Sequence, residues 1–161
     1  MLAGDTAAFL EMVGPASALL GLDPGTKTIG VAICDERRTL ASPLETIQRN
    51  GLRADLERLR QLVAQREARG IVLGMPVNMD GTPGRRAQSV RAFSRSIEAA
   101  LVLPVIHWDE RLSTVAATEA MIDAEISRVK RSPRIDAAAA ASILQGAIET
   151  FAADAARRTD R

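Results

Sequence analysis

The sequence has one cysteine, Cys34, one histidine, His107, and no tyrosine. A lone cysteine excludes a disulfide framework within the chain, which fits a reducing compartment. The scarcity of Cys and His also excludes a zinc site of the usual kind. Cys34 lies in an apolar strand-like pattern and is expected to be a small buried side chain. His107 lies in a short apolar segment, where a structural role is expected rather than that of a general base.

Aromatic residues make up only 2% of the chain, and Lys27 and Lys130 are the only lysines. Extensive stacking on nucleic-acid bases is therefore disfavoured, and a bound nucleic acid would be held mainly by its backbone. Arginine suits phosphate recognition because its guanidinium can bind two oxygens at once. Genomic composition would explain the overall arginine excess equally well. The net charge of +1 does not by itself indicate a nucleic-acid partner.

No apolar run has the length of a membrane span, and no basic residue precedes Lys27. We therefore expect neither a membrane anchor nor a signal peptide, and a cytoplasmic location. The length of 161 residues, with 47% hydrophobic and 25% charged residues, is typical of one globular domain. We expect that domain over residues 18–153. Residues 1–17 are predicted to be an extension that can be disordered, and residues 154–161 a polar tail.

The segment 19–34 predicts a hairpin, because two apolar runs flank the turn residues Asp23, Pro24 and Gly25. A third extended segment, 38–47, contains Pro43, which favours an edge strand or a bulge. Apolar residues at helical spacing then alternate with short apolar runs. They predict helices over 52–70, 85 onward, 113–124 and 135–153, and strands over 71–73 and 103–108. This order predicts an α/β fold with a five-stranded mixed sheet flanked by helices.

Three carboxylates occupy comparable places in this arrangement. Asp23 closes the first strand, Glu110 closes the last strand, and Asp136 begins the last helix. Sites in such sheets gather beyond the carboxyl ends of the parallel strands. The alanines of 137–141 would let the last helix approach the sheet closely. Alternatively, Asp23 only opens its turn, Glu110 pairs with Arg111 on the surface, and Asp136 favours the helix dipole.

A carboxylate cluster of this kind suits divalent cations. Mg²⁺ prefers oxygen ligands, and two ions about 3.5–4 Å apart can activate water and stabilise the leaving oxygen in phosphodiester cleavage. Because adjacent carboxylates repel one another, a bound cation would make the cluster tolerable. Asp23, Glu110 and Asp136 are thus the candidate catalytic residues and ligands for Mg²⁺ or Mn²⁺.

Four segments together resemble the family of pre-16S rRNA nucleases, also called YqgF-type or Holliday-junction-resolvase-like. They are LGLDPGTKTIGVAICD, LGMPVNMDGTPGRRA, WDERLSTVAA and IDAAAAASILQG, in order between Leu19 and Phe151. The resemblance implies an RNase H-like fold and a cytoplasmic nuclease that processes the 5′ end of pre-16S rRNA. It places the acidic metal-binding set on Asp23, Glu110 and Asp136. Many members carry a second basic residue where this chain has Thr28.

With this resemblance, several basic residues become candidates for nucleic-acid binding. Lys27 matches a basic position of the first motif, and Arg111 follows the motif glutamate. Arg85 and Arg86 lie near a predicted helix N-terminus, which favours anions. The connection 127–134 is a candidate phosphate-binding loop, or alternatively a solvated surface. Its basic residues are Arg128, Lys130, Arg131 and Arg134.

The leading hypothesis is a metal-dependent endonuclease acting on structured RNA, as a monomer or a weak homodimer. A resolvase of branched DNA is the alternative within nucleases, and it would require a dimer that presents two sites. A non-catalytic factor binding ribosomal RNA or the transcription machinery is a further alternative. An ATPase of the actin and sugar-kinase kind also uses an Asp-x-Gly-Thr turn, but this chain lacks room for a second lobe.

Overall fold

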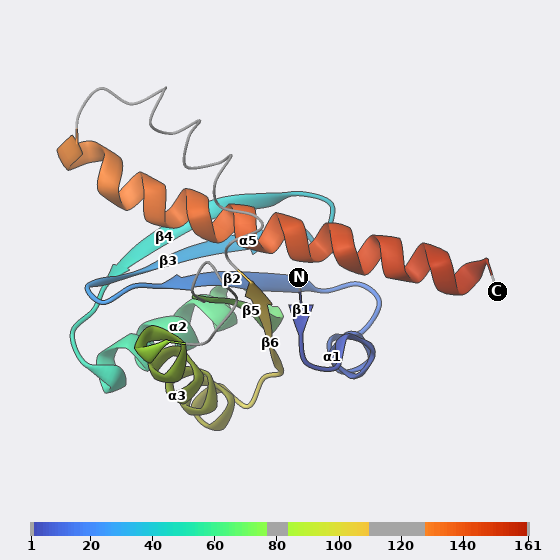
Figure 1. Cartoon of the computed structure of the whole chain (residues 1–161), viewed down its shortest axis with the longest axis horizontal. Coiled ribbons are helices and arrows are strands. Elements are labelled where there is room, and N and C mark those ends of the chain that lie inside the picture. The colour runs from blue at the N-terminus through green and yellow to red at the C-terminus, as the bar shows by residue number, and fades with distance from the viewer. Residues whose placement is uncertain (1, 77–83, 110–127, 161) are drawn as a thin grey trace.

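The computed structural model describes residues 2–76, 84–109 and 128–160, and their side chains over 4–76, 84–109 and 136–160. Strands and helices alternate over most of this range (Figure 1). The strands are β1 (Leu2–Ala3), β2 (Ala18–Pro24), β3 (Thr28–Cys34), β4 (Ala41–Gln48), β5 (Ala68–Met75) and β6 (Val105–Asp109). The helices are α1 (Thr6–Val13), α2 (Leu52–Arg66), α3 (Arg85–Leu101) and α5 (Arg128–Thr159).

The sheet has the order β1-β6-β5-β2-β3-β4. Strands β2, β5 and β6 are parallel, whereas β3 and β4 continue from β2 as an antiparallel meander. The predicted five-stranded mixed sheet is therefore confirmed, and the short β1 adds a sixth strand beside β6. Strand β4 lies at the sheet edge, and the register shifts where Pro43 pairs with Ala32. Pro43 thus marks both an edge strand and an irregularity, as predicted.

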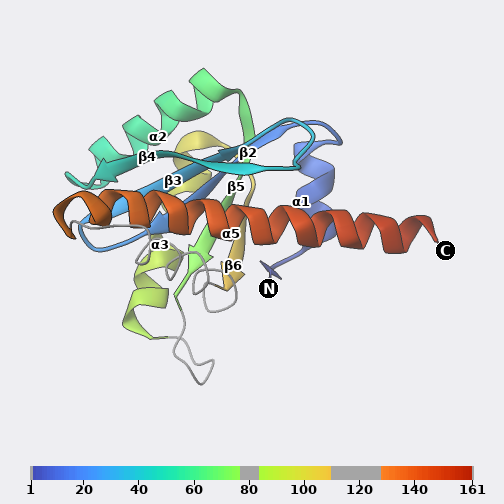
Figure 2. The ribbon, with the colours of Figure 1, turned by 90° about the horizontal axis from the view of Figure 1, so that it is seen from above.

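Helices cover both faces of the sheet, and each face has its own core (Figure 2). On one face, α2 and α3 pack side chains such as Leu59, Phe93 and Ile97 against the strands. On the other face, α5 and α1 pack with Cys34 and Trp108 among the buried residues. The predicted burial of Cys34 is confirmed, and Phe93 and Trp108 are buried as well. The two faces matter for function because successive side chains of a strand point to opposite faces.

The N-terminal segment is folded, which corrects the interpretation of residues 1–17 as an extension that can be disordered. The carboxylate of Asp5 accepts a hydrogen bond from the Ala8 amide at 3.1 Å and caps α1. Phe9 and Val13, one helical turn apart, are buried against the core. The ring of Phe9 lies 5.7 Å from that of Phe151 in α5. The apolar pattern here is too short to signal a helix by itself, but contact with α5 stabilises it.

Helix α5 is longer at both ends than predicted. It begins at Arg128 instead of near residue 135, so residues 128–134 are helical and do not form the expected loop. It ends at Thr159, and much of the expected polar tail is therefore its last turns. Although α5 has 32 residues, no helix within the described part of the chain is long and apolar enough to cross a membrane.

The packing of α1 predicts unequal effects of truncating two of its side chains. Phe9 is 4% exposed and Met12 is 67% exposed. We expect Phe9→Ala to lower the free energy of unfolding by about 3–5 kcal/mol, because it leaves a cavity beside Phe151. Met12→Ala, the matched control on the same helix, should change it by less than about 0.5 kcal/mol. Urea unfolding measures both, and equal effects would show that α1 is not part of the core.

Candidate metal and nucleic-acid site

The β2–β3 hairpin places Asp23 at the carboxyl end of the sheet. The turn comprises Gly25–Lys27 and is closed by a hydrogen bond of 2.7 Å from the Gly25 amide to the Thr28 carbonyl. Asp23 pairs directly with Gly30 on β3. Residues paired in this way project from the same face of the sheet. The side chain of Asp23 therefore projects from the same face of the sheet as a Cβ atom at Gly30 would.

That face is the one covered by α5. A Cβ atom at Gly30 would collide with the backbone carbonyl of Asp136. Glycine at this position therefore permits α5 to touch β3. A Cβ at Gly21 would lie 2.7 Å from the Cβ of Leu144 and 2.9 Å from the carbonyl oxygen of Ala140. The expected close approach of the alanine-rich helix is thus present. This approach places Asp136 against Gly30, the residue that pairs with Asp23 across the hairpin.

A hydrogen bond fixes the orientation of the Asp136 side chain. The hydroxyl of Thr28 donates to Oδ2 of Asp136 at 2.6 Å, although the two residues are 108 positions apart. Thr28 lies on the same face of β3 as Gly30, two residues away. The other carboxylate oxygen of Asp136 takes no part in this bond. Asp23, Thr28 and Asp136 are all partly exposed, so solvent and ions can reach them.

The third predicted carboxylate, Glu110, lies outside the described residues, as do Arg111 and the helix expected over 113–124. Glu110 follows Asp109, the last residue of β6. Leu22, Leu73 and His107 form one row across β2, β5 and β6, so the carboxyl ends of these parallel strands meet at one edge. Among the residues whose placement is described, no three Asp, Glu, His or Cys side chains form a possible metal cluster.

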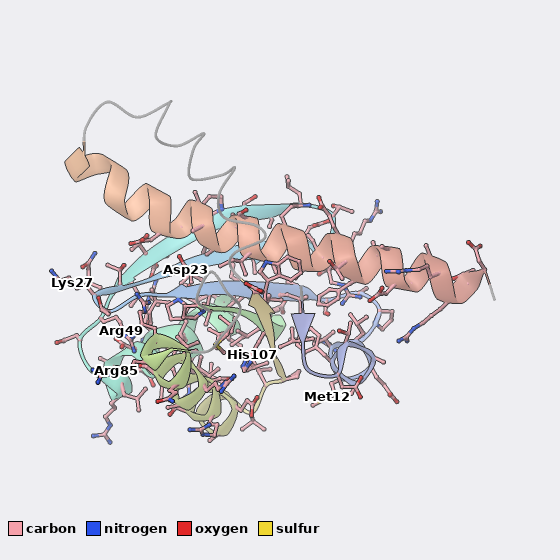
Figure 3. The ribbon with its side chains drawn as sticks, in the orientation of Figure 1. Met12, Asp23, Lys27, Arg49, Arg85 and His107 are labelled. Atoms are coloured by element: carbon pink, nitrogen blue, oxygen red, sulfur yellow. The ribbon has the colours of Figure 1, made fainter. Side chains whose placement is uncertain are left out.

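The predicted basic residues fall into two groups. Lys27 is exposed in the hairpin turn, and Arg85 and Arg86 begin α3, as the predicted helix start required. Figure 3 shows Lys27 and Arg85 at the same end of the molecule. Arg128, Lys130, Arg131 and Arg134 lie in α5, and their side chains are outside the described set, as is Arg111.

Two residues of this region were not among the predicted site residues. Thr28 was noted only as a departure from a basic position, whereas its hydroxyl contacts Asp136. Arg49 follows β4, and its Nη1 donates to the carbonyl of Gly25 at 2.8 Å. Nothing in the local sequence distinguishes Arg49 from the other arginines, because its partners are distant along the chain. The contacts of Thr28 and Arg49 exist only in the folded protein and have no signal in the sequence.

His107 is structural, as expected. Its Nε2 lies 2.9 Å from the hydroxyl oxygen of Ser94, a buried residue of α3. Burial lowers the pKa of His107 below its ordinary value, chiefly by removing water from the charged form. A neutral imidazole beside a buried hydroxyl holds α3 against β6.

The solved structures with a similar fold include two of RuvC from Thermus thermophilus. The structure with a Holliday junction substrate has a TM-score of 0.58 at 16% identity and covers 85% of this chain and 96% of that one. A second RuvC structure has a TM-score of 0.54 at 12% identity, with 84% and 96% covered. The likeness to these structures shows that the chain has a RuvC-type, RNase H-like fold.

A family model described as RuvX, Holliday junction resolvase, matches residues 17–150, and the chain belongs to this family. A protein of Rhodobacter capsulatus named "Putative pre-16S rRNA nuclease" is 54% identical over 148 residues, which cover 92% of this chain and 91% of the relative. A Sphingopyxis alaskensis protein with the same name is 56% identical over 133 residues, covering 83% and 87%.

The contact between Gly30 and Asp136 predicts a specific intolerance of side chains. We expect Gly30→Ala to lower the free energy of unfolding by about 1–3 kcal/mol, because its methyl group must displace α5. Ser42→Ala on the exposed edge strand should change it by less than about 0.5 kcal/mol. Chemical unfolding followed by circular dichroism measures both. A Gly30→Ala protein as stable as the wild type would contradict the close approach of α5.

Proposed function

We propose that this protein is a metal-dependent endonuclease that processes the 5′ end of pre-16S rRNA in the cytoplasm. The observation that carries the proposal is the convergence of Asp23 and Asp136 on one face of the sheet edge. Two segments more than a hundred residues apart supply these carboxylates, and α5 is held there by contact with Gly30. The names of the relatives from Rhodobacter capsulatus and Sphingopyxis alaskensis support the RNA substrate.

The donor set suits a hard cation. Carboxylate oxygens are the side-chain ligands that Mg²⁺ and Mn²⁺ prefer, and the two aspartates are partly exposed as an ion that keeps several waters requires. Thr28 orients Asp136 in the manner of an outer-shell partner. We assign Glu110 as the third ligand, because it follows β6 and only β5 separates that strand from β2. The backbones of β2 and β6 therefore lie roughly 10 Å apart, within reach of two acidic side chains.

When bound, such an ion supplies positive charge that activates water and stabilises the leaving oxygen. The residues of the chain do the positioning. The closed hairpin fixes the backbone at Asp23, and the Thr28 hydroxyl orients the Asp136 carboxylate, so that little rearrangement would be needed to bind the ion. Lys27 in the hairpin turn and Arg85 and Arg86 at the start of α3 would hold the negatively charged backbone of the substrate.

Resolution of branched DNA is the second candidate, since the family model carries that description. It would need two sites presented by a dimer, whereas cleavage of an RNA leader needs only one. A pre-16S leader and a four-way DNA junction, incubated separately with the purified protein and Mg²⁺ or Mn²⁺, distinguish the two. Paired incisions in the junction, with the leader left intact, would reject the RNA proposal.

The role of Asp23 predicts loss of cleavage on its replacement. We expect Asp23→Asn to reduce the cleavage rate of the leader in Mn²⁺ by more than the roughly 10–100-fold that loss of an outer-shell partner causes. Asp154→Asn is the matched control, because Asp154 pairs with Arg157 on the surface of α5. Circular dichroism should show that both variants remain folded. Equal cleavage by Asp23→Asn and the wild type would remove Asp23 from the mechanism.

The Thr28 contact predicts an effect on metal affinity in particular. Thr28→Val keeps the shape of the side chain but removes the donor to Asp136, so we expect the Mn²⁺ concentration for half-maximal cleavage to rise about 10-fold. Thr28→Ser keeps the hydroxyl and should remain within about 2-fold of the wild type. If both variants require the same Mn²⁺ concentration, Thr28 does not position a metal ligand.

A further inference from the structure

A second candidate site lies on the opposite side of the hairpin from Asp23. It is a pocket of about 290 Å³ between the hairpin turn and the start of α3, here called the arginine pocket. Its polar lining comes from Arg49, Arg85, Arg86 and Ser89 together with the backbone of Gly25 and Thr26. Figure 3 shows Arg49 and Arg85 close to Lys27 at one end of the molecule.

Arg49 is held in place from three directions. Its Nε donates to Oδ2 of Asp55 at 3.2 Å, its Nη1 donates to the Gly25 carbonyl at 2.8 Å, and its guanidinium lies 5.0 Å from the centre of the Phe93 ring. Asp55 is only 2% exposed and also accepts the Asn50 amide at 3.0 Å. A guanidinium fixed in this way has little conformational entropy left to lose when it binds an anion.

Within the described part of the chain, the arginines of the pocket have more N–H donors than acceptors that contact them. A guanidinium has five N–H groups. Among the described residues, Arg49 commits two of them, and Arg86 commits one to the Pro24 carbonyl at 2.8 Å. Of the carboxylates whose placement is described, only Asp55 contacts one of these arginines, so three described positive charges face one described negative charge. The excess of donors and charge matches an oxyanion with several oxygens, such as a phosphate.

We infer that the arginine pocket binds a backbone phosphate of the nucleic-acid substrate, other than the phosphate that is cleaved. This inference rests on the proposed nuclease function and extends its binding site. Pro24 lines the pocket and Asp23 precedes it, so the two side chains project to opposite faces of the sheet. The substrate backbone then passes over the hairpin tip, with the cleaved phosphate on the α5 side and a second phosphate on the α3 side.

Binding in the absence of cleavage tests this inference independently of the nuclease proposal. The probe is a fluorescent RNA hairpin with a single-stranded 5′ extension, titrated with the full-length protein in EDTA between 50 and 200 mM KCl. Ser89→Glu places a carboxylate at the pocket without touching the Arg49–Asp55 pair. We expect it to weaken binding about 10-fold and to reduce the slope of log K against log salt by about 1. Ser42→Glu adds the same charge at the far end of β4 and should bind within 2-fold of the wild type.

A second pair of variants tests Arg49 itself. Arg49→Lys keeps the charge beside Asp55 but loses the fork, and we expect about 3–10-fold weaker RNA binding. Arg69→Lys, an exposed residue at the opposite end of the sheet, should have no effect. Unchanged binding by both Ser89→Glu and Arg49→Lys, with folding verified by circular dichroism, would overturn the inference. Saturation of the pocket by micromolar inorganic phosphate, without competition against RNA, would also overturn it and indicate a small phosphate ligand instead.

Discussion

The close contact between α5 and the sheet at Gly21 and Gly30 is the constraint on which the site depends. Helices usually pack on sheets through a layer of side chains. Here a Cβ at Gly30 would collide with the Asp136 carbonyl, so backbone meets backbone. As a result, the carboxylate of Asp136 accepts a hydrogen bond from Thr28 and lies next to strands β2 and β3, the first of which carries Asp23. Glycine at position 30 therefore serves the geometry of a site to which it contributes no side chain.

The hairpin between β2 and β3 has an acidic residue, Asp23, on one face of the sheet and the arginine pocket on the other. Alternation along a strand sends Asp23 to one face and Pro24 to the other. The acidic face suits a cation, and the arginine pocket on the other face suits phosphate. Charges of opposite sign so close together would normally neutralise each other by direct pairing. The backbone of the sheet edge lies between them, so Arg86 contacts the Pro24 carbonyl instead of the Asp23 carboxylate.

The sequence was sufficient to predict most of the sheet, because apolar alternation and turn residues are local signals. Strand β4 with Pro43 and the helix start at Arg85 are examples. The short helix α1 was missed because its stability comes from the distant contact of Phe9 with Phe151. The position of Asp23 at the end of β2 could be predicted from the turn residues that follow it, whereas its role as a metal ligand stays a prediction. Thr28 and Arg49 could not be predicted as site residues, because a threonine in a strand and an arginine after a strand are common. Their partners are distant along the chain and come close only in the folded protein.

The ion pair of Arg49 and Asp55 is better explained by position than by stability. Asp55 is almost fully buried, whereas the Arg49 side chain is 26% exposed. Burial of a carboxylate carries a large desolvation penalty, and such pairs often stabilise a fold no better than apolar residues would. A leucine at position 55 would avoid this penalty, but it would remove the acceptor for Nε of Arg49. What the buried carboxylate provides is a fixed orientation of Arg49, with its remaining N–H groups available to an oxyanion. In the proposed binding mode, Asp55 of α2 would act on the substrate only through the arginine that it holds.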